Sequence, residues 1–128
     1  MMIKFFKRLL SFGIRKNRRF NVREGVYVIM ENSFARNQIS NISMGGLAVN
    51  YEDNGYTLGK GSYELKLVGN HRQKVDKIPF KRVTEHQMGE VLYPYRNIKR
   101  LGLQFEGLTR VQRTQLRHFI ADQTIGSA

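Results

Sequence analysis

The hydrophobic positions of this 128-residue chain follow a helical period at both ends and a strand-like pattern between them. In residues 3–14 the apolar side chains fill one side of a helical wheel, and lysine, arginine and serine fill the other. This pattern predicts a basic amphipathic helix. In residues 62–68, by contrast, Tyr63, Leu65 and Leu67 alternate with Glu64 and Lys66, as in a strand with one buried face.

The middle of the chain predicts several short strands joined by turns, with no helix between them. The expected strands lie at 26–30, 46–51, 62–68, around 74–85, at 90–95 and within 99–107. Asn54-Gly55 and residues 69–72 carry turn signals. Such spacing favours an antiparallel sandwich or barrel. Pro79 and Pro94 fall inside two of these runs, so we expect them at sheet edges or bulges.

The C-terminal region returns to a helical period. Thr109 followed by Gln112 has the pattern of a capping box. Five apolar residues then share one side of the wheel: Leu108, Val111, Leu116, Phe119 and Ile120. We expect this helix to close one end of a barrel, in a chain without repeats, low-complexity segments or interdomain linkers.

Composition narrows the functional classes. With no cysteine, the chain has neither disulfides nor a thiolate nucleophile. Its net charge of +12 is unevenly distributed, because residues 1–23 contain eight cations and no acid. A basic N-terminal segment on a nearly balanced body predicts an anionic partner, namely a nucleotide, a nucleic acid or a membrane surface.

No apolar run approaches the roughly 20 residues of a transmembrane helix, and no small-residue cleavage site follows the N-terminal segment. We therefore expect a cytoplasmic protein. The helix at residues 3–14 packs on its own domain, forms a homodimer contact, or lies on an anionic lipid surface. The last alternative would make the protein peripheral to the inner membrane.

Two polar motifs carry the candidate chemistry. Arg19 and Arg23 form R-x-x-x-R, with Arg18 directly ahead of them. Asn41, Ser43 and Gly46 form N-x-S-x-x-G, which runs into the apolar segment GLAV. Each motif alone arises by chance in many chains. The two motifs together, in this order, are less often due to chance. The arginines are expected in a loop before the first strand, and the serine-glycine turn precedes a later strand.

With these motifs, the chain resembles the PilZ domain, a bacterial receptor module for cyclic di-GMP. The resemblance extends from about Arg18 to Asp122 and includes RRFNVR, NISMGGLAV, LGKGSYELKL, LGLQFEGL and the C-terminal helix. It implies a six-stranded antiparallel β-barrel with the nucleotide site on its outer surface. The chain then divides into an N-terminal extension (1–17), the PilZ-like domain (18–122) and a tail (123–128).

The resemblance implies a ligand site made of both motifs, and the residue types suit cyclic di-GMP. The expected ligand-binding residues are Arg18, Arg19, Arg23, Asn41, Ser43, Gly45 and Gly46. Guanidinium groups can fork onto phosphate oxygens or the guanine O6/N7 edge, and they also stack on purines. Glycines let the backbone approach a ligand closely and can adopt positive φ. In the family, an arginine in the place of Arg18 accompanies a stacked pair of ligand molecules.

Asn41 stands where many family members have aspartate. Its amide oxygen can accept from a guanine N–H, but a carboxylate would make that bond charge-assisted, so we expect asparagine to hold the base less tightly. The Ser43 hydroxyl either donates to a phosphate or braces the turn. In the free protein we expect mutually repelling cations to keep residues 18–23 mobile. A bound ligand would order them and signal to a downstream protein that the sequence does not identify.

An enzyme is not expected. His71, His86 and His118 lack metal-ligand spacing, and Ser43 has no recognisable base. No phosphate loop, metal site or cofactor is predicted. One alternative is a small basic barrel for single-stranded nucleic acid, but the tyrosines do not cluster for base stacking. The other is an adaptor without a ligand that docks through its N-terminal helix.

Overall fold

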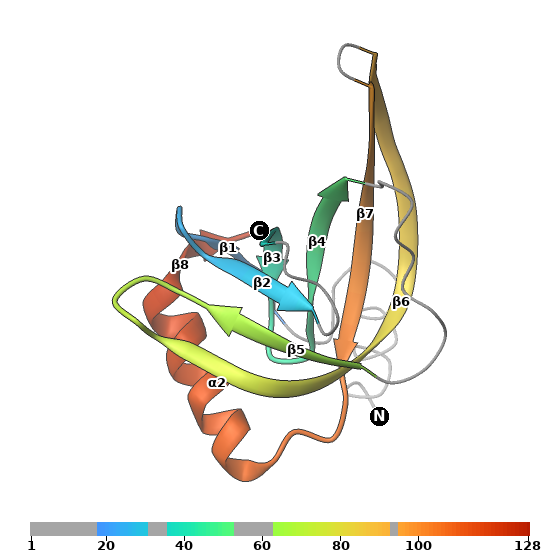
Figure 1. The fold of residues 1–128 in the computed structure, drawn as a ribbon. Coiled ribbons are helices and arrows are strands. Elements are labelled where there is room, and N and C mark those ends of the chain that lie inside the picture. The colour runs from blue at the N-terminus through green and yellow to red at the C-terminus, as the bar shows by residue number, and fades with distance from the viewer. Residues whose placement is uncertain (1–17, 31–35, 53–62, 93–94) are drawn as a thin grey trace, which may run out of the picture.

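The computed structural model describes residues 18–30, 36–52, 63–92 and 95–128 (Figure 1). The predicted helix at 3–14, Asn54-Gly55 and Pro94 lie outside the described residues. Eight strands and one helix follow in chain order: β1 (Phe20–Val22), β2 (Tyr27–Met30), β3 (Asn37–Ile42), β4 (Gly46–Glu52), β5 (Tyr63–Val68), β6 (Lys74–Leu92), β7 (Tyr95–Phe105), α2 (Arg110–Gln123) and β8 (Thr124–Ser127).

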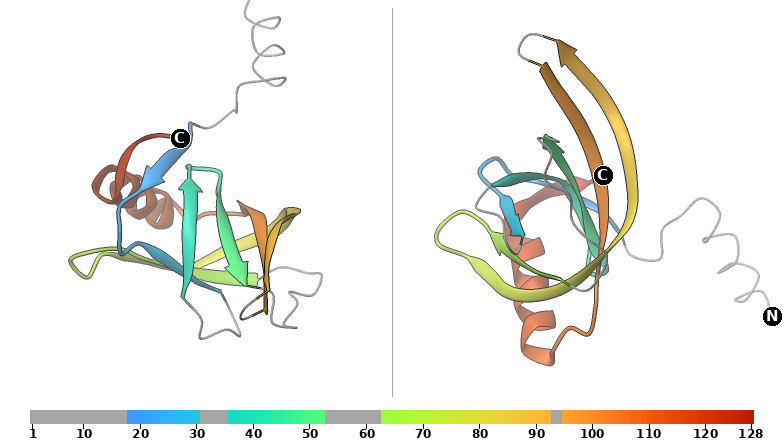
Figure 2. Two further views of the ribbon diagram at one scale, coloured as in Figure 1. Left: turned by 90° about the horizontal axis from the view of Figure 1, so that it is seen from above. Right: turned by 45° about the vertical axis from the view of Figure 1, so that its right-hand side comes forward.

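Six of these strands close into an antiparallel barrel. The hydrogen-bonded order is β2-β5-β6-β7-β4-β3, and a further pairing between β2 and β3 joins the ends. Strands β1 and β8 continue the sheet beyond β3, outside the closed ring. The predicted barrel is therefore confirmed, and the two views in Figure 2 show it with the helix lying against one side.

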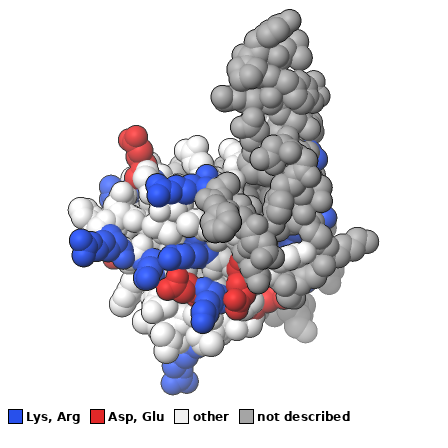
Figure 3. Space-filling view, viewed as in Figure 1, with Lys and Arg blue, Asp and Glu red and all other residues white. Residues whose placement is uncertain are grey.

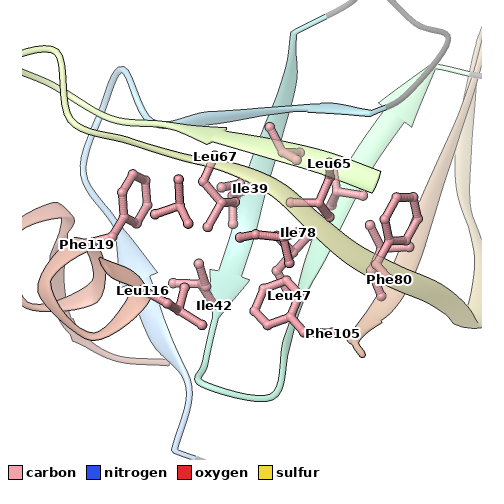
Figure 4. Close-up of a cluster of buried hydrophobic side chains, with 14 of the residues drawn as sticks. Ile39, Ile42, Leu47, Leu65, Leu67, Ile78, Phe80, Phe105, Leu116 and Phe119 are labelled. Carbon is pink, nitrogen blue, oxygen red and sulfur yellow. The ribbon is translucent and has the colours of Figure 1, made fainter. Parts of the chain in front are cut away.

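The barrel interior is filled by side chains from alternating strand positions (Figure 4). Leu65 and Leu67 of β5 are buried, as the alternation predicts. Helix α2 contributes Leu116, Phe119 and Ile120 to the same core, and so covers the barrel as expected. Burying each of these large side chains stabilises the fold by about 1.5–3 kcal/mol.

The capping box at the start of α2 is confirmed. The Gln112 backbone N–H donates to Thr109 Oγ1, and the Thr109 backbone N–H donates to Gln112 Oε1, both over 3.0 Å. The prediction for Val111 is wrong, because its side chain is 65% exposed. The polar Gln123 is instead buried at the other end of the helix, where it bonds to Asn70 and Gln73 in the β5–β6 turn.

The two stretches expected at 74–85 and 90–95 lie mainly on one long strand, β6. It pairs with β7 from Phe80↔Phe105 to Leu92↔Tyr95, and bulges interrupt the register twice. Strand β4 accompanies β7 only as far as the pair Glu52↔Ile98, so the rest of the hairpin projects as a two-stranded ribbon (Figures 1 and 2). Pro79 pairs with Glu64 next to a bulge in the β5–β6 ladder, as predicted.

Three strands were not predicted. Strand β3 has only two apolar residues, Ile39 and Ile42, and their spacing of three does not match the period of two in a regular strand. Strand β1 occupies the segment expected as an arginine loop, and β8 occupies part of the expected tail. Each of the last two is too short to show a period. Within the described part of the chain, no helix has the length and apolar character needed to cross a membrane.

Candidate functional site

The pairing of β1 with β3 brings the two sequence motifs together. Phe20 lies opposite Ile42 in this antiparallel pair. Arg19 and Asn41 each precede one of these residues, and the Arg19 Nη1 atom donates to Asn41 Oδ1 over 2.7 Å. Residues from the arginine segment and from the serine-glycine turn therefore meet directly, as the resemblance implied.

A bulge in β3 directs Asn41 away from the core. Ile39 and Ile42 are both core residues although they are three positions apart, which a regular strand does not allow. The register with β4 shifts between Ile39 and Asn41, leaving Ser40 as the extra residue. Asn41 then pairs with Ala48, between the core positions Leu47 and Val49, and so lies on the outer face of the barrel.

Ser43 braces the turn between β3 and β4. Its backbone N–H donates to the Gly46 carbonyl over 2.8 Å, and its hydroxyl donates to the same oxygen over 3.3 Å. The Gly45 N–H in turn donates to Ser43 Oγ over 3.1 Å. With only 3% of Ser43 exposed, the hydroxyl performs the bracing role that the sequence offered as one alternative.

Of the two turn glycines, Gly46 is needed for close packing. Neither Gly45 nor Gly46 has a positive φ, so the conformational freedom expected at these positions is not used. A Cβ on Gly46 would lie 2.1 Å from the Leu103 carbonyl oxygen of β7. The Gly45 carbonyl accepts from the Phe105 N–H over 2.9 Å. The turn is therefore fixed against β7.

The side chains of Arg18 and Arg23 are held by C-terminal residues. Arg18 donates to Ser127 Oγ through Nε over 2.9 Å and through Nη2 over 2.6 Å. Arg23 Nε donates over 3.1 Å to the backbone carbonyl of Asp122 at the end of α2. The structure thus brings Arg19, Asn41 and Ser43 together, whereas the two flanking arginines extend toward the end of the chain.

The contribution of the C-terminal segment was missed in the sequence. Strand β8 pairs with β1 through Phe20↔Ser127 and Asn21↔Gly126. The Ala128 N–H also donates to the Arg19 carbonyl over 3.0 Å. No periodic pattern in residues 124–127 indicates this contact, because it depends on where α2 ends relative to β1.

The arginine segment contributes positive charge beside the turn. Arg18 bonds to the Ser127 hydroxyl, Arg19 to the Asn41 amide oxygen and Arg23 to the Asp122 carbonyl, and all three acceptors are neutral groups. Elsewhere charges are paired, as for Lys66 and Lys74 with Asp76. These exposed pairs contribute little to stability. The described part of the face in Figure 3 accordingly shows acidic groups among the basic ones.

The two histidines whose side chains the structure describes, His71 and His118, lie on elements that do not form this site. His71 lies in the β5–β6 turn and His118 is exposed on α2, while the side chain of His86 lies outside the described residues. The described residues also contain no group of three or more histidine, aspartate or glutamate side chains that could hold a metal ion.

The described residues thus form a small closed β-barrel with an arginine segment fixed against an external glycine turn. The PilZ domain family model matches residues 14–122. The chain belongs to the PilZ domain family. No curated protein matches the sequence significantly.

Solved structures share this fold at low sequence identity. The PilZ domain of YcgR from Escherichia coli with c-di-GMP has a TM-score of 0.64 and 14% identity, over 84% of this chain and 89% of that chain. The MrkH–c-di-GMP complex from Klebsiella ("K. pneumonia") has a TM-score of 0.62 and 14% identity, over 84% and 51%. The Bacillus subtilis inhibitor of motility (MotI/DgrA) has a TM-score of 0.56 and 18% identity, over 84% and 50%. This chain therefore aligns with about half of the latter two chains.

Proposed function

We propose that this protein is a receptor for cyclic di-GMP that binds its ligand where the arginine segment meets the Asn41–Gly46 turn. The observation that carries the proposal is the Arg19–Asn41 hydrogen bond, which holds a guanidinium beside that turn on the outer barrel surface. Family membership supports it, as do the c-di-GMP complexes named for YcgR and MrkH.

Each side chain has a defined role in this proposal. Arg19 carries a planar guanidinium, and such a fork of N–H donors matches a phosphate or the guanine O6/N7 edge. Asn41 orients this group and presents its amide to a base. Ser43 keeps the turn in shape, so its role in binding is indirect.

Ligand binding is proposed to redirect Arg18 and Arg23. Their present partners are a serine hydroxyl and a backbone carbonyl, and a doubly charged ligand offers stronger, charge-assisted bonds. Strand β1 lies between β3 and β8, so a change in its contacts reaches the residues before Arg18 and the C-terminal strand. We propose that this change fixes the side chains of Arg18 and Arg23 on the ligand and signals to a downstream protein. The ligand can shift the balance between the free and the bound arrangement of the arginines only by the difference between its affinities for these two arrangements.

Two further features belong to the proposal. Arg18 lies next to the motif, bonds to the exposed Ser127 hydroxyl and lies over the Phe20 ring, 5.6 Å from its centre. On this exposed surface we propose that it contacts a second ligand molecule stacked on the first. The protein acts as a non-catalytic binding module in the bacterial cytoplasm, where it meets this second messenger.

Isothermal titration calorimetry tests the proposal. We expect cyclic di-GMP to bind the wild-type chain, and a single-stranded oligonucleotide to bind weakly with a steep salt dependence. Arg19→Ala should remove cyclic di-GMP binding while the circular dichroism spectrum stays unchanged. A wild-type protein that takes up no cyclic di-GMP, or prefers the oligonucleotide, would contradict the proposal.

A further inference from the structure

A pocket of about 700 Å³ lies beside the motif site, between β3 and the segment that joins β1 to β2. Strand β3 pairs with β1 at Ile42 and with β2 at Asn37 and Gln38. Between these two pairings, residues 21–26 pass alongside β3 but form no strand pair with it. The pocket fills this interval, and Arg23 of the first motif forms part of its wall.

One part of the pocket wall is an arginine stacked on an aromatic ring. The Arg36 guanidinium carbon lies 4.9 Å from the centre of the Tyr27 ring. Both residues line the pocket. A guanidinium in this arrangement offers a flat cationic surface, and such a surface stacks on purine bases. None of the sequence motifs includes either residue.

Two carboxamides lie beside this pair. Gln38 and Asn50 are opposite each other in the β3–β4 ladder, and both line the pocket. Among the described residues, Asn50 Oδ1 is the buried side-chain atom for which no hydrogen-bond partner is found. A buried acceptor without a partner is unfavourable, so a ligand N–H that reached it after a side-chain rotation would gain a bond at little cost.

The lining also carries a carboxylate that can bond to a base. Glu24 lies in the wall together with Arg23 and Arg36. A carboxylate repels a phosphate, but it accepts hydrogen bonds from the N1–H and N2–H₂ donors of guanine. Apolar atoms of Val22 and Ile39 complete the lining and suit the flat face of a base.

We propose that this pocket is a guanine subsite, in which Arg36 and Tyr27 stack on a base and Asn50 recognises its edge. The base belongs to the nucleotide whose phosphates are held at Arg19, so the inference rests on the proposed function. The pocket thereby gives the protein a further means of distinguishing guanine from adenine, in addition to Arg19 and Asn41.

Arg36→Lys is the informative variant, because it keeps the positive charge and removes the planar group. We expect calorimetry to show cyclic di-GMP affinity reduced roughly tenfold, in line with the loss of one base-stacking contact. Arg113→Lys is the matched control, since Arg113 is exposed on α2 and does not line the pocket. Its affinity should equal that of the wild type.

Asn50→Ala tests recognition of the base edge. The ratio of cyclic di-GMP to cyclic di-AMP affinity should fall roughly tenfold relative to the wild type, mainly through weaker cyclic di-GMP binding. Thermal unfolding of each variant shows whether the fold is retained, and Gln38→Ala provides a second pocket variant if Asn50→Ala unfolds.

The outcomes separate the subsite from the receptor function. If Arg19→Ala abolishes binding but Arg36→Lys and the carboxamide variants bind and discriminate like the wild type, the guanine subsite is wrong and the receptor proposal stands. If the wild type does not bind cyclic di-GMP at all, both are wrong. Reduced affinity in Arg36→Lys, with Arg113→Lys unchanged, supports the subsite.

Discussion

Arg19 Nη1 and Asn41 Oδ1 are joined by a 2.7 Å hydrogen bond, although 22 positions separate the two residues in the chain. The bond restrains the long Arg19 side chain before any ligand binds. Ordering a free arginine side chain on binding would cost up to about 2 kcal/mol of rotamer entropy. A guanidinium held in this way is already oriented when a ligand arrives, which lowers the cost of binding. The same contact also ties β1 to the outer face of β3.

Replacing Arg19 should have the largest effect on binding. We expect Arg19→Ala to weaken cyclic di-GMP binding at least a hundredfold, since it removes charge-assisted bonds that contribute about 1.5–3 kcal/mol each. Arg19→Lys should recover only part of the loss, because lysine cannot form a planar fork. Calorimetry provides the affinities, and Arg113→Ala on α2 is the control. Wild-type affinity in Arg19→Ala would place the ligand elsewhere.

Asn41→Asp should strengthen binding. A carboxylate accepts charge-assisted bonds, which are about twice as strong as neutral ones, from both Arg19 and a guanine N–H. We expect a three- to tenfold gain in affinity in a titration with cyclic di-GMP. A loss of affinity would show that the added negative charge acts mainly on the ligand phosphates, and hence that residue 41 does not contact a base.

Arg18→Ala tests the proposed pair of ligand molecules. Arg18 must leave Ser127 in order to contact a ligand, and its removal should spare the contacts of Arg19. We expect the stoichiometry in calorimetry to change from two ligands per chain to one. Ser127→Ala is the companion variant, because it frees Arg18 and should leave the stoichiometry at two. A single ligand on the wild type would contradict the pair.

Gly46→Ala should destabilise the barrel. The added Cβ would collide with the backbone oxygen of Leu103, so β4 and β7 would have to separate. We expect a loss of about 2–4 kcal/mol in the free energy of unfolding, measured by urea denaturation. Gly107→Ala provides the comparison. A Cβ added at Gly107 would meet no atom within 4 Å, but the residue has a φ of 54°. The free energy of unfolding should therefore fall only by the left-handed backbone penalty of about 1 kcal/mol. Equal losses would exclude the packing explanation.

Much of the barrel could be predicted because its central strands alternate clearly. Leu65 and Leu67 face the core as their spacing indicates, and the Thr109–Gln112 capping box marks the true start of α2. The position of Val111 could not be predicted, because it lies on the flank of the helix and its burial depends on how the helix rotates against the barrel. Gln123 was missed for a similar reason, since its side-chain hydrogen bonds are to Asn70 and Gln73 in a distant turn.

The strand-rich domain, the C-terminal helix and the two motifs with their residue types could all be predicted from the sequence, because they depend on local periodicity and on side-chain chemistry. The contact between Arg19 and Asn41, the bulge that turns Asn41 outward, and the pairing of β8 with β1 beside Arg18 were known only from the folded structure. These relationships arise from strand pairing between residues far apart in the chain. Their register is set by long-range packing, which no local pattern encodes.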